Sequence, residues 1–128
     1  MTNLNRYLVV GYDSVIGKSL IEHLAQKNNV VYGTSRRKGI IKENIFYLDL
    51  SIEPSNWEFP PEISIAIICV GISSIIFCKN NPRISRITNV INIEKFARRL
   101  IQNGIRIIFI SSNMVFDGSI PYTKVDQR

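Results

Sequence analysis

Two apolar runs rich in isoleucine constrain the fold of this chain more than any other feature. Residues 63–70 and 105–110 each contain four isoleucines and few polar residues. β-Branched side chains favour strands, and strands that are apolar on both faces are typical of parallel sheets buried between two layers. We therefore expect both runs to be buried strands of one parallel sheet.

Shorter segments complete an alternation of strands and crossovers. Three more strands are predicted at residues 7–10, 30–34 and 44–48, so the two isoleucine-rich runs become the fourth and fifth strands. Helices are predicted at residues 16–27 and 82–103, the second starting at Pro82 and ending before Gly104. Residues 73–81 should form a polar loop, and the proline-containing stretch 51–62 a loop with one helical turn near residues 54–57.

This order of elements predicts an α/β fold. The expected architecture is a Rossmann-type doubly wound parallel sheet with strand order 3-2-1-4-5, truncated after the fifth strand. A chain of 128 residues with 45% hydrophobic content fits a single domain over residues 1–128. In such sheets, ligands bind beyond the carboxyl ends of the strands, so candidate functional residues should lie in the loops that follow them.

A glycine-containing turn joins the first strand to the first helix. Backbone N–H groups and the helix dipole at such a turn can bind a pyrophosphate, although Gly11 and Gly17 would equally serve a tight structural turn. Ser14 stands where the middle glycine of the GxxGxxG spacing is expected, so its hydroxyl either blocks the closest backbone approach or supplies a donor. The candidate dinucleotide-binding residues of this turn are Gly11, Asp13, Ser14, Val15, Ile16 and Gly17.

The residues after the second strand bear on the choice of cofactor. An NAD site normally has an acidic residue there for the ribose 2′-hydroxyl, whereas this chain has Ser35, Arg36 and Arg37. Guanidinium groups bind a 2′-phosphate through charge-assisted hydrogen bonds, so the sequence favours NADP(H) over NAD(H) as cofactor. The alternative is a solvated basic turn. Asp49, after the third strand, would accept from the adenine amino group or cap the next turn.

Composition narrows the range of partners. The net charge is +6, but the sixteen Lys and Arg residues are scattered, so we expect no nucleic-acid partner. Cys69 and Cys78 have neither CxxC spacing nor a histidine cluster, which indicates free thiols and no metal site. The first six residues lack a secretion signal, and no apolar run approaches the roughly 20 residues that span a bilayer. We therefore expect a cytoplasmic protein with no membrane partner.

The fifth strand ends in a polar segment that carries two hydroxyl groups. Ser111 and Ser112 directly follow the apolar run, at the edge of the sheet where ligands bind. Together with the earlier segments, this stretch resembles the amino-terminal part of the extended short-chain dehydrogenase/reductases, and most closely the dTDP-4-dehydrorhamnose reductase group. The motifs that carry the resemblance are residues 11–17, Ser35-Arg36, Asp49-Leu50, Cys69-Val70-Gly71, residues 78–82 with Asn89-Val90, and residues 111–118, which match the family's S[ST]xxVFDG stretch.

The resemblance covers residues 7–126 and implies roles for several residues. Pro121, Tyr122 and Asp126 continue the family pattern, whereas Lys124 stands where an acidic residue is usual. Ser112 occupies the position of the catalytic Ser or Thr, whose hydroxyl bonds to the substrate carbonyl. Asn89 would help to organise the site, or make a bond within its own helix. The resemblance adds Leu50, Val70, Gly71 and Ser111 to the candidate cofactor-binding residues.

The family's proton donor is missing from these 128 residues. In the family, a YxxxK motif supplies a tyrosine that donates the proton and a lysine that lowers its pKa, but none of the five tyrosines here has a lysine four positions later. General acid catalysis typically contributes about 10²- to 10⁴-fold in rate, so little turnover is expected without it. The family's substrate domain, formed by carboxyl-terminal segments, is also absent.

Two functional hypotheses follow. In the first, the chain is the NADP(H)-binding part of a nucleotide-sugar reductase or epimerase, inactive alone, with a nucleotide-sugar substrate and a completing protein chain as further partners. In the second, it is a non-catalytic dinucleotide-binding or regulatory module. Both require a nicotinamide dinucleotide partner.

Overall fold

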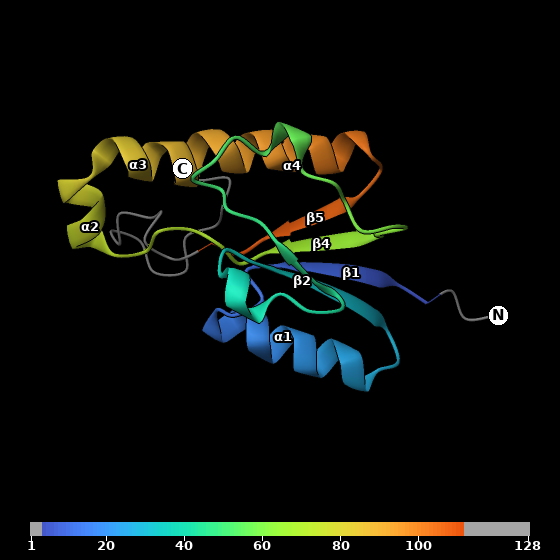
Figure 1. Cartoon of the computed structure of the whole chain (residues 1–128). Helices are drawn as coiled ribbons and strands as arrows, with labels where there is room; N and C mark the ends of the chain where they lie inside the picture. The colour runs from blue at the N-terminus through green and yellow to red at the C-terminus, as the bar shows by residue number, and fades with distance from the viewer. Residues whose placement is uncertain (1–3, 112–128) are drawn as a thin grey trace, which may run out of the picture.

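The computed structural model describes residues 4–111, and a five-stranded parallel sheet forms its centre (Figure 1). The strands are β1 (Arg6–Val10), β2 (Val30–Ser35), β3 (Ile45–Tyr47), β4 (Ile65–Ile68) and β5 (Arg106–Phe109). Their order is β3-β2-β1-β4-β5, and every neighbouring pair is parallel. The predicted Rossmann-type sheet is therefore confirmed.

Helices cover the two faces of this sheet. Helix α1 (Val15–Gln26) lies on one face, and the segments α3 (Pro82–Arg86), η3 (Ile87–Asn92) and α4 (Ile93–Gln102) run along the other (Figure 1). The short helix α2 (Ile75–Asn80) lies beyond the carboxyl ends of the strands, and two 3₁₀ turns, η1 (Lys38–Ile40) and η2 (Pro54–Asn56), interrupt the loops.

The main core fills the space between the sheet and α4. Leu8 and Val10 of β1 point to this face because side chains alternate along a strand, and both are fully buried. Phe96 and Leu100, one helical turn apart on α4, are likewise fully buried against them. The remaining members of this cluster are Leu48, Leu50, Ile63, Ala66, Ile68, Ile93 and Ile105.

Helix α1 packs closely against the opposite face because β2 carries a glycine there. A Cβ atom at Gly33 would lie 2.7 Å from the Cβ of Tyr12 and 3.1 Å from the Cδ1 of Ile21. Leu20, Ile21 and Leu24 form the half-buried face of α1, as the helical spacing predicts. The glycine thus lets the helix, and the turn before it, lie directly on the sheet.

The loop between β3 and β4 is held by aromatic and guanidinium contacts. The Trp57 ring packs edge-on against Phe96 with centroids 5.5 Å apart, and its Nε1 donates to the carbonyl of Tyr47 at 2.7 Å. Arg99 of α4 donates to the carbonyls of Pro54 and Trp57 and stacks on Phe59. The expected helical turn is present as η2, and the loop packs on α4 as well as against the end of β3.

One local prediction was wrong. Residues 75–80, expected to lie in a polar loop, form α2, whose first turn is capped by the Ser74 hydroxyl accepting from the Phe77 N–H at 3.2 Å. The helix predicted over residues 82–103 is present, and its middle segment, η3, is π-helical. This detail could not be predicted, because an amphipathic spacing does not reveal the hydrogen-bond pattern within one long helix.

The edge strand β5 is less buried than its composition predicts. Ile108 pairs with Ile67 of β4, but Ile108 is 45% exposed whereas Ile67 is 6% exposed. Phe109 and Ile110 are also exposed, because no element among residues 4–111 lies beyond β5 or covers its outer face. Within the same residues, no helix has the length and apolar character needed to cross a membrane.

Phe96 should be the most costly single truncation on α4. We expect Phe96→Ala to lower the free energy of unfolding by about 3–5 kcal/mol, because it removes a fully buried ring that contacts Trp57 and Phe59. Ile101→Ala, on the same helix but 63% exposed, should cost less than about 1 kcal/mol. Urea unfolding of the two variants provides the measurement, and equal losses would contradict the assigned core.

Candidate functional site

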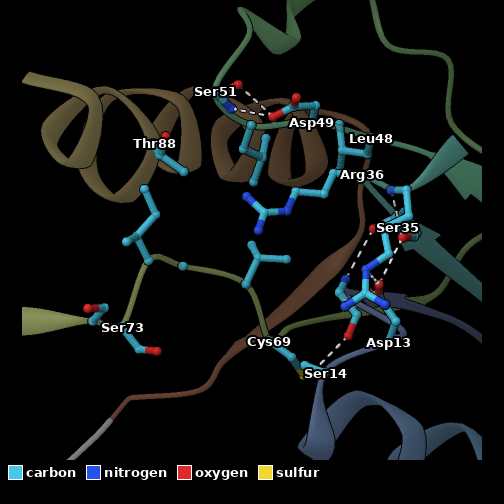
Figure 2. A pocket seen from close by; sticks show the side chains of 18 of the residues that line it. Asp13, Ser14, Ser35, Arg36, Leu48, Asp49, Ser51, Cys69, Ser73 and Thr88 are labelled. Carbon is cyan, nitrogen blue, oxygen red and sulfur yellow. Dashed lines mark hydrogen bonds and ion pairs between the residues drawn. The ribbon is translucent and has the colours of Figure 1, made fainter. Parts of the chain in front are cut away.

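A cavity of about 700 Å³ opens at the carboxyl ends of the strands (Figure 2). Its walls come from the β1–α1 turn, the end of β2, and the loops that follow β3 and β4. Ten residues predicted to bind the cofactor line it: Gly11, Asp13, Ser14, Ser35, Arg36, Arg37, Asp49, Leu50, Val70 and Gly71. Gly11 and Gly71, which are 60 positions apart in the sequence, are therefore brought to one site.

A smaller hollow of about 380 Å³ adjoins this cavity. It shares Ser14, Val70 and Gly71 with the cavity and adds Val15 and Ile16 from the start of α1. Ile110, after β5, forms another part of its wall. Ser111, the next residue, is exposed and lines neither hollow. The predicted catalytic Ser112 lies outside the described residues.

The turn before α1 is closed by Ser14. Its hydroxyl donates to the carbonyl of Gly11 at 2.8 Å and accepts from the N–H of Gly17 at 3.0 Å, so Ser14 is the N-cap of α1. The proton of this hydroxyl is therefore used within the turn. Capping of α1 was not among the roles predicted for this serine, and both roles predicted for it toward a pyrophosphate stay predictions.

Both glycines of the turn are required by close approaches. A Cβ atom at Gly17 would lie 2.1 Å from the carbonyl oxygen of Gly11, which no packing adjustment of a side chain could relieve. Gly11 has φ +88°, and a Cβ there would lie 2.7 Å from Cγ1 of Val70. The N–H of Gly11 donates to the buried Thr34 hydroxyl at 3.1 Å, which fixes the turn to β2.

Asp13 is held at the end of β2 by two contacts. Its Oδ2 accepts from the Ser35 hydroxyl at 3.1 Å and lies 3.2 Å from Nε of Arg37. The Ser35 hydroxyl in turn accepts from the backbone N–H of Arg37 at 3.0 Å. The Asp13 side chain is only 17% exposed, whereas that of Arg37 is 70% exposed. This three-residue network could not be predicted from the sequence, because Asp13 and Ser35 are 22 positions apart.

Arg36 differs from Arg37 in its surroundings. Figure 2 shows its side chain extending into the cavity below Leu48 and Asp49, away from Asp13. Among the described residues it makes no ion pair, whereas Arg37 pairs with Asp13. Of the two arginines that line the cavity, Arg36 is therefore the one whose charge is not neutralised by an acidic residue among residues 4–111.

Asp49 makes a local turn at the rim of the cavity. Its Oδ1 accepts from the backbone N–H of Ser51 at 2.9 Å and from the Ser51 hydroxyl at 2.7 Å (Figure 2). This is the turn-capping role, one of the two interpretations of this aspartate. A role toward adenine remains a prediction that would use the other carboxylate oxygen.

The π-helical segment η3 ties together the two loops that flank the cavity. Asn89 donates from Nδ2 to the carbonyl of Ile72 at 2.9 Å and accepts from the N–H of Ile72 at 2.7 Å, so it fixes the loop after β4. Asn92, 3% exposed, donates to the carbonyl of Leu50 after β3 at 2.8 Å. The organising role expected of Asn89 is thus supported by its contacts, whereas Asn92 was missed.

One further residue of the cavity wall was not singled out from the sequence. Thr88 borders the cavity from η3, and its Oγ1 is buried without a hydrogen-bond partner among the described residues. Cys69, from the predicted Cys69-Val70-Gly71 motif, borders both hollows, and burial raises the pKa of its thiol. Residues 4–111 contain no group of three His, Cys, Asp or Glu side chains placed to hold a metal ion.

Solved structures share this fold, although no family model and no curated protein matches the sequence. A short-chain dehydrogenase/reductase superfamily protein from Agrobacterium tumefaciens with bound NAD matches with TM-score 0.73 and 17% identity, over 93% of this chain and 36% of that chain. The dTDP-4-dehydrorhamnose reductase from Bacillus anthracis in complex with NADP matches with TM-score 0.71 and 17% identity, over 94% of this chain and 41% of that chain. UDP-glucose 4-epimerase from Thermus thermophilus in complex with NAD matches with TM-score 0.67 and 19% identity, over 84% of this chain and 37% of that chain.

These matches establish the fold. They include a dTDP-4-dehydrorhamnose reductase, the group that the sequence motifs indicated, so the resemblance is confirmed at the level of the fold. The chain spans about two fifths of the length of these three structures. Some of these proteins were solved with NAD and one with NADP.

Gly17 offers a direct test of the turn geometry. We expect Gly17→Ala to lower the free energy of unfolding by about 1–3 kcal/mol, because the added methyl group would collide with the Gly11 carbonyl. Gly39→Ala is the matched control: its Cβ would meet no atom within 4 Å, so the change should stay within about 0.5 kcal/mol. Thermal and urea unfolding measure both; a neutral Gly17→Ala would contradict the close approach.

Proposed function

We propose that this chain binds a nicotinamide dinucleotide in the cavity at the carboxyl ends of its strands, as the cofactor-binding part of a nucleotide-sugar reductase or epimerase. The observation that carries the proposal is the meeting of the glycine turn and Arg36 in one cavity. The first is suited to a pyrophosphate, and the second to an anionic group on the ribose. The solved structures with the same fold, which include reductases and epimerases of this kind, support the same assignment.

The donors available at the turn fit a pyrophosphate. Val15 and Ile16 are the first two residues of α1, so their N–H groups have no partner within the helix, and both side chains are exposed beside the smaller hollow. The Ser14 hydroxyl satisfies the third N–H, that of Gly17. The positive end of the α1 dipole adds to the attraction for an anion at this point.

A bound dinucleotide would supply or accept a hydride. This chain's part is to bind and orient it: the β1–α1 turn would hold the pyrophosphate, the end of β2 the adenosine ribose, and the loop at Val70 and Gly71 the remainder. Ser112, by its place in the resemblance, would hydrogen-bond to the carbonyl oxygen of a substrate. The nucleotide sugar itself is proposed from the resemblance.

NADP(H) is the preferred cofactor in this proposal. Arg36 lines the cavity and makes no ion pair with any of residues 4–111. Charge-assisted hydrogen bonds to a phosphate contribute roughly 1.5–3 kcal/mol each when well formed. Because Arg36 is exposed, solvent screens its charge and lowers the free energy that each such hydrogen bond contributes.

Arg36→Ala should therefore weaken NADPH binding by about tenfold and leave NADH binding within about twofold, since NADH lacks the 2′-phosphate. Fluorescence titration of both cofactors provides the dissociation constants. Arg98→Ala on α4 removes the same charge from a surface ion pair with Glu94 and should change neither. Equal loss for the two cofactors in Arg36→Ala would remove the 2′-phosphate assignment.

A second candidate is a dinucleotide-binding module without catalysis; these 128 residues contain no YxxxK motif. Both candidates predict cofactor binding, and both predict no detectable NADPH oxidation when these 128 residues are mixed with a dTDP-linked 4-keto sugar. Measurable turnover would show that another group donates the proton. The reading frame beyond Arg128 separates the candidates, because a YxxxK motif shortly downstream would favour the enzyme and a stop codon the module.

A further inference from the structure

One carboxylate in the cavity works against an anionic ligand. Asp13 comes from the glycine turn, but its contacts with Ser35 and Arg37 hold it at the end of β2. That is the place where an acidic residue serves the ribose hydroxyls of NAD in Rossmann-type folds. Here the acidic group comes from a different element, so inspection of the β2 sequence alone does not find it.

The contacts of Asp13 engage two of the three groups that favour a 2′-phosphate. The Ser35 hydroxyl proton is donated to its Oδ2, and the Arg37 Nε lies 3.2 Å from the same oxygen. Arg36 alone extends into the cavity without an ion pair in the described part of the chain (Figure 2). A 2′-phosphate would therefore have to share Ser35 and Arg37 with a carboxylate of its own sign.

The same carboxylate suits a neutral ribose. Asp13 Oδ1 makes no hydrogen bond or ion pair within residues 4–111, so it retains capacity to accept from a hydroxyl. A carboxylate is an acceptor only, which is the requirement for a 2′-hydroxyl and the opposite of the requirement for a 2′-phosphate.

We propose that Asp13 is a specificity-determining residue that limits the preference for NADP(H) and allows the site to bind NAD(H) as well. This inference rests on the proposed dinucleotide-binding function and deepens it. Arg36 favours binding of the 2′-phosphate, and Asp13 opposes it. Arg37 pairs with Asp13 and neutralises its charge when no ligand is bound. The balance of these three charges sets the ratio of the two affinities.

A different role for Asp13 would have the opposite sign. If it served only to orient Arg37 toward a phosphate, its loss would weaken NADPH binding. The exposure of Arg37 argues against this: its side chain is 70% exposed, and no hydrogen bond joins its guanidinium to Asp13 within residues 4–111, so the ion pair leaves Arg37 free to adopt other rotamers. The direction of the change in affinity therefore decides between the two roles.

Asp13→Asn is the test, because it removes the charge and keeps an oxygen that can accept from Ser35. We expect the NADPH-to-NADH affinity ratio, measured by fluorescence titration, to rise by about three- to tenfold, as charge pairs near a protein surface suggest. Glu94→Gln on α4 is the matched control, since it removes a carboxylate from an exposed ion pair with Arg98 that lies outside the cavity, and it should leave the ratio within twofold.

An unchanged or lower ratio in a folded Asp13→Asn protein would overturn the assignment of Asp13, with the proposed function intact. Failure of the unmutated chain to bind either cofactor would overturn the proposed function and Asp13's role together. Should Asp13→Asn fail to fold, Arg37→Ala tests the same contact from the exposed partner. It frees the Asp13 carboxylate, so NADH affinity should rise while NADPH affinity falls, and an unchanged NADH affinity would overturn the inference.

Discussion

The contact between the first turn of α1 and the carbonyl of Gly11 fixes most of what surrounds the cavity. Because Gly17 has no side chain, α1 begins directly against the end of β1, and Ser14 can bridge the two glycines. Gly11 in turn lies against Val70, so the same turn determines how closely the loop after β4 approaches. A larger residue at either glycine would move the helix and open the floor of the cavity.

The strand order and the meeting of the candidate residues could be predicted because both depend on local signals. Apolar, β-branched runs identify β4 and β5 without knowledge of their partners, and glycine with a following helical pattern identifies the first turn. Once a parallel sheet is inferred, the carboxyl ends of its strands must share one edge. The residues after β1, β2, β3 and β4 therefore had to converge, and the cavity is lined by them.

Features that depend on distances across the fold could not be predicted. Nothing near Asp13 in the sequence indicates Ser35 as its partner, and Asn92 contacts Leu50 across 42 positions. Arg99 resembles any surface arginine until the β3–β4 loop is placed over α4. Helix α2 was missed for a different reason: it has only 6 residues, and its apolar residues, Ile75 to Cys78, are consecutive, so the sequence shows no helical spacing there.

If a dinucleotide binds as proposed, different groups of the site provide its affinity and its specificity. The pyrophosphate is common to NAD and NADP, and the groups offered to it are backbone N–H donors of α1, which carry no net charge and need no rearrangement. The ribose 2′-substituent is the part that differs, and every charged residue of the cavity except Asp49 lies near it: Asp13, Arg36 and Arg37. Because charges respond to solvent and salt far more than fixed amides do, selectivity should vary more readily with ionic strength than affinity for the shared part.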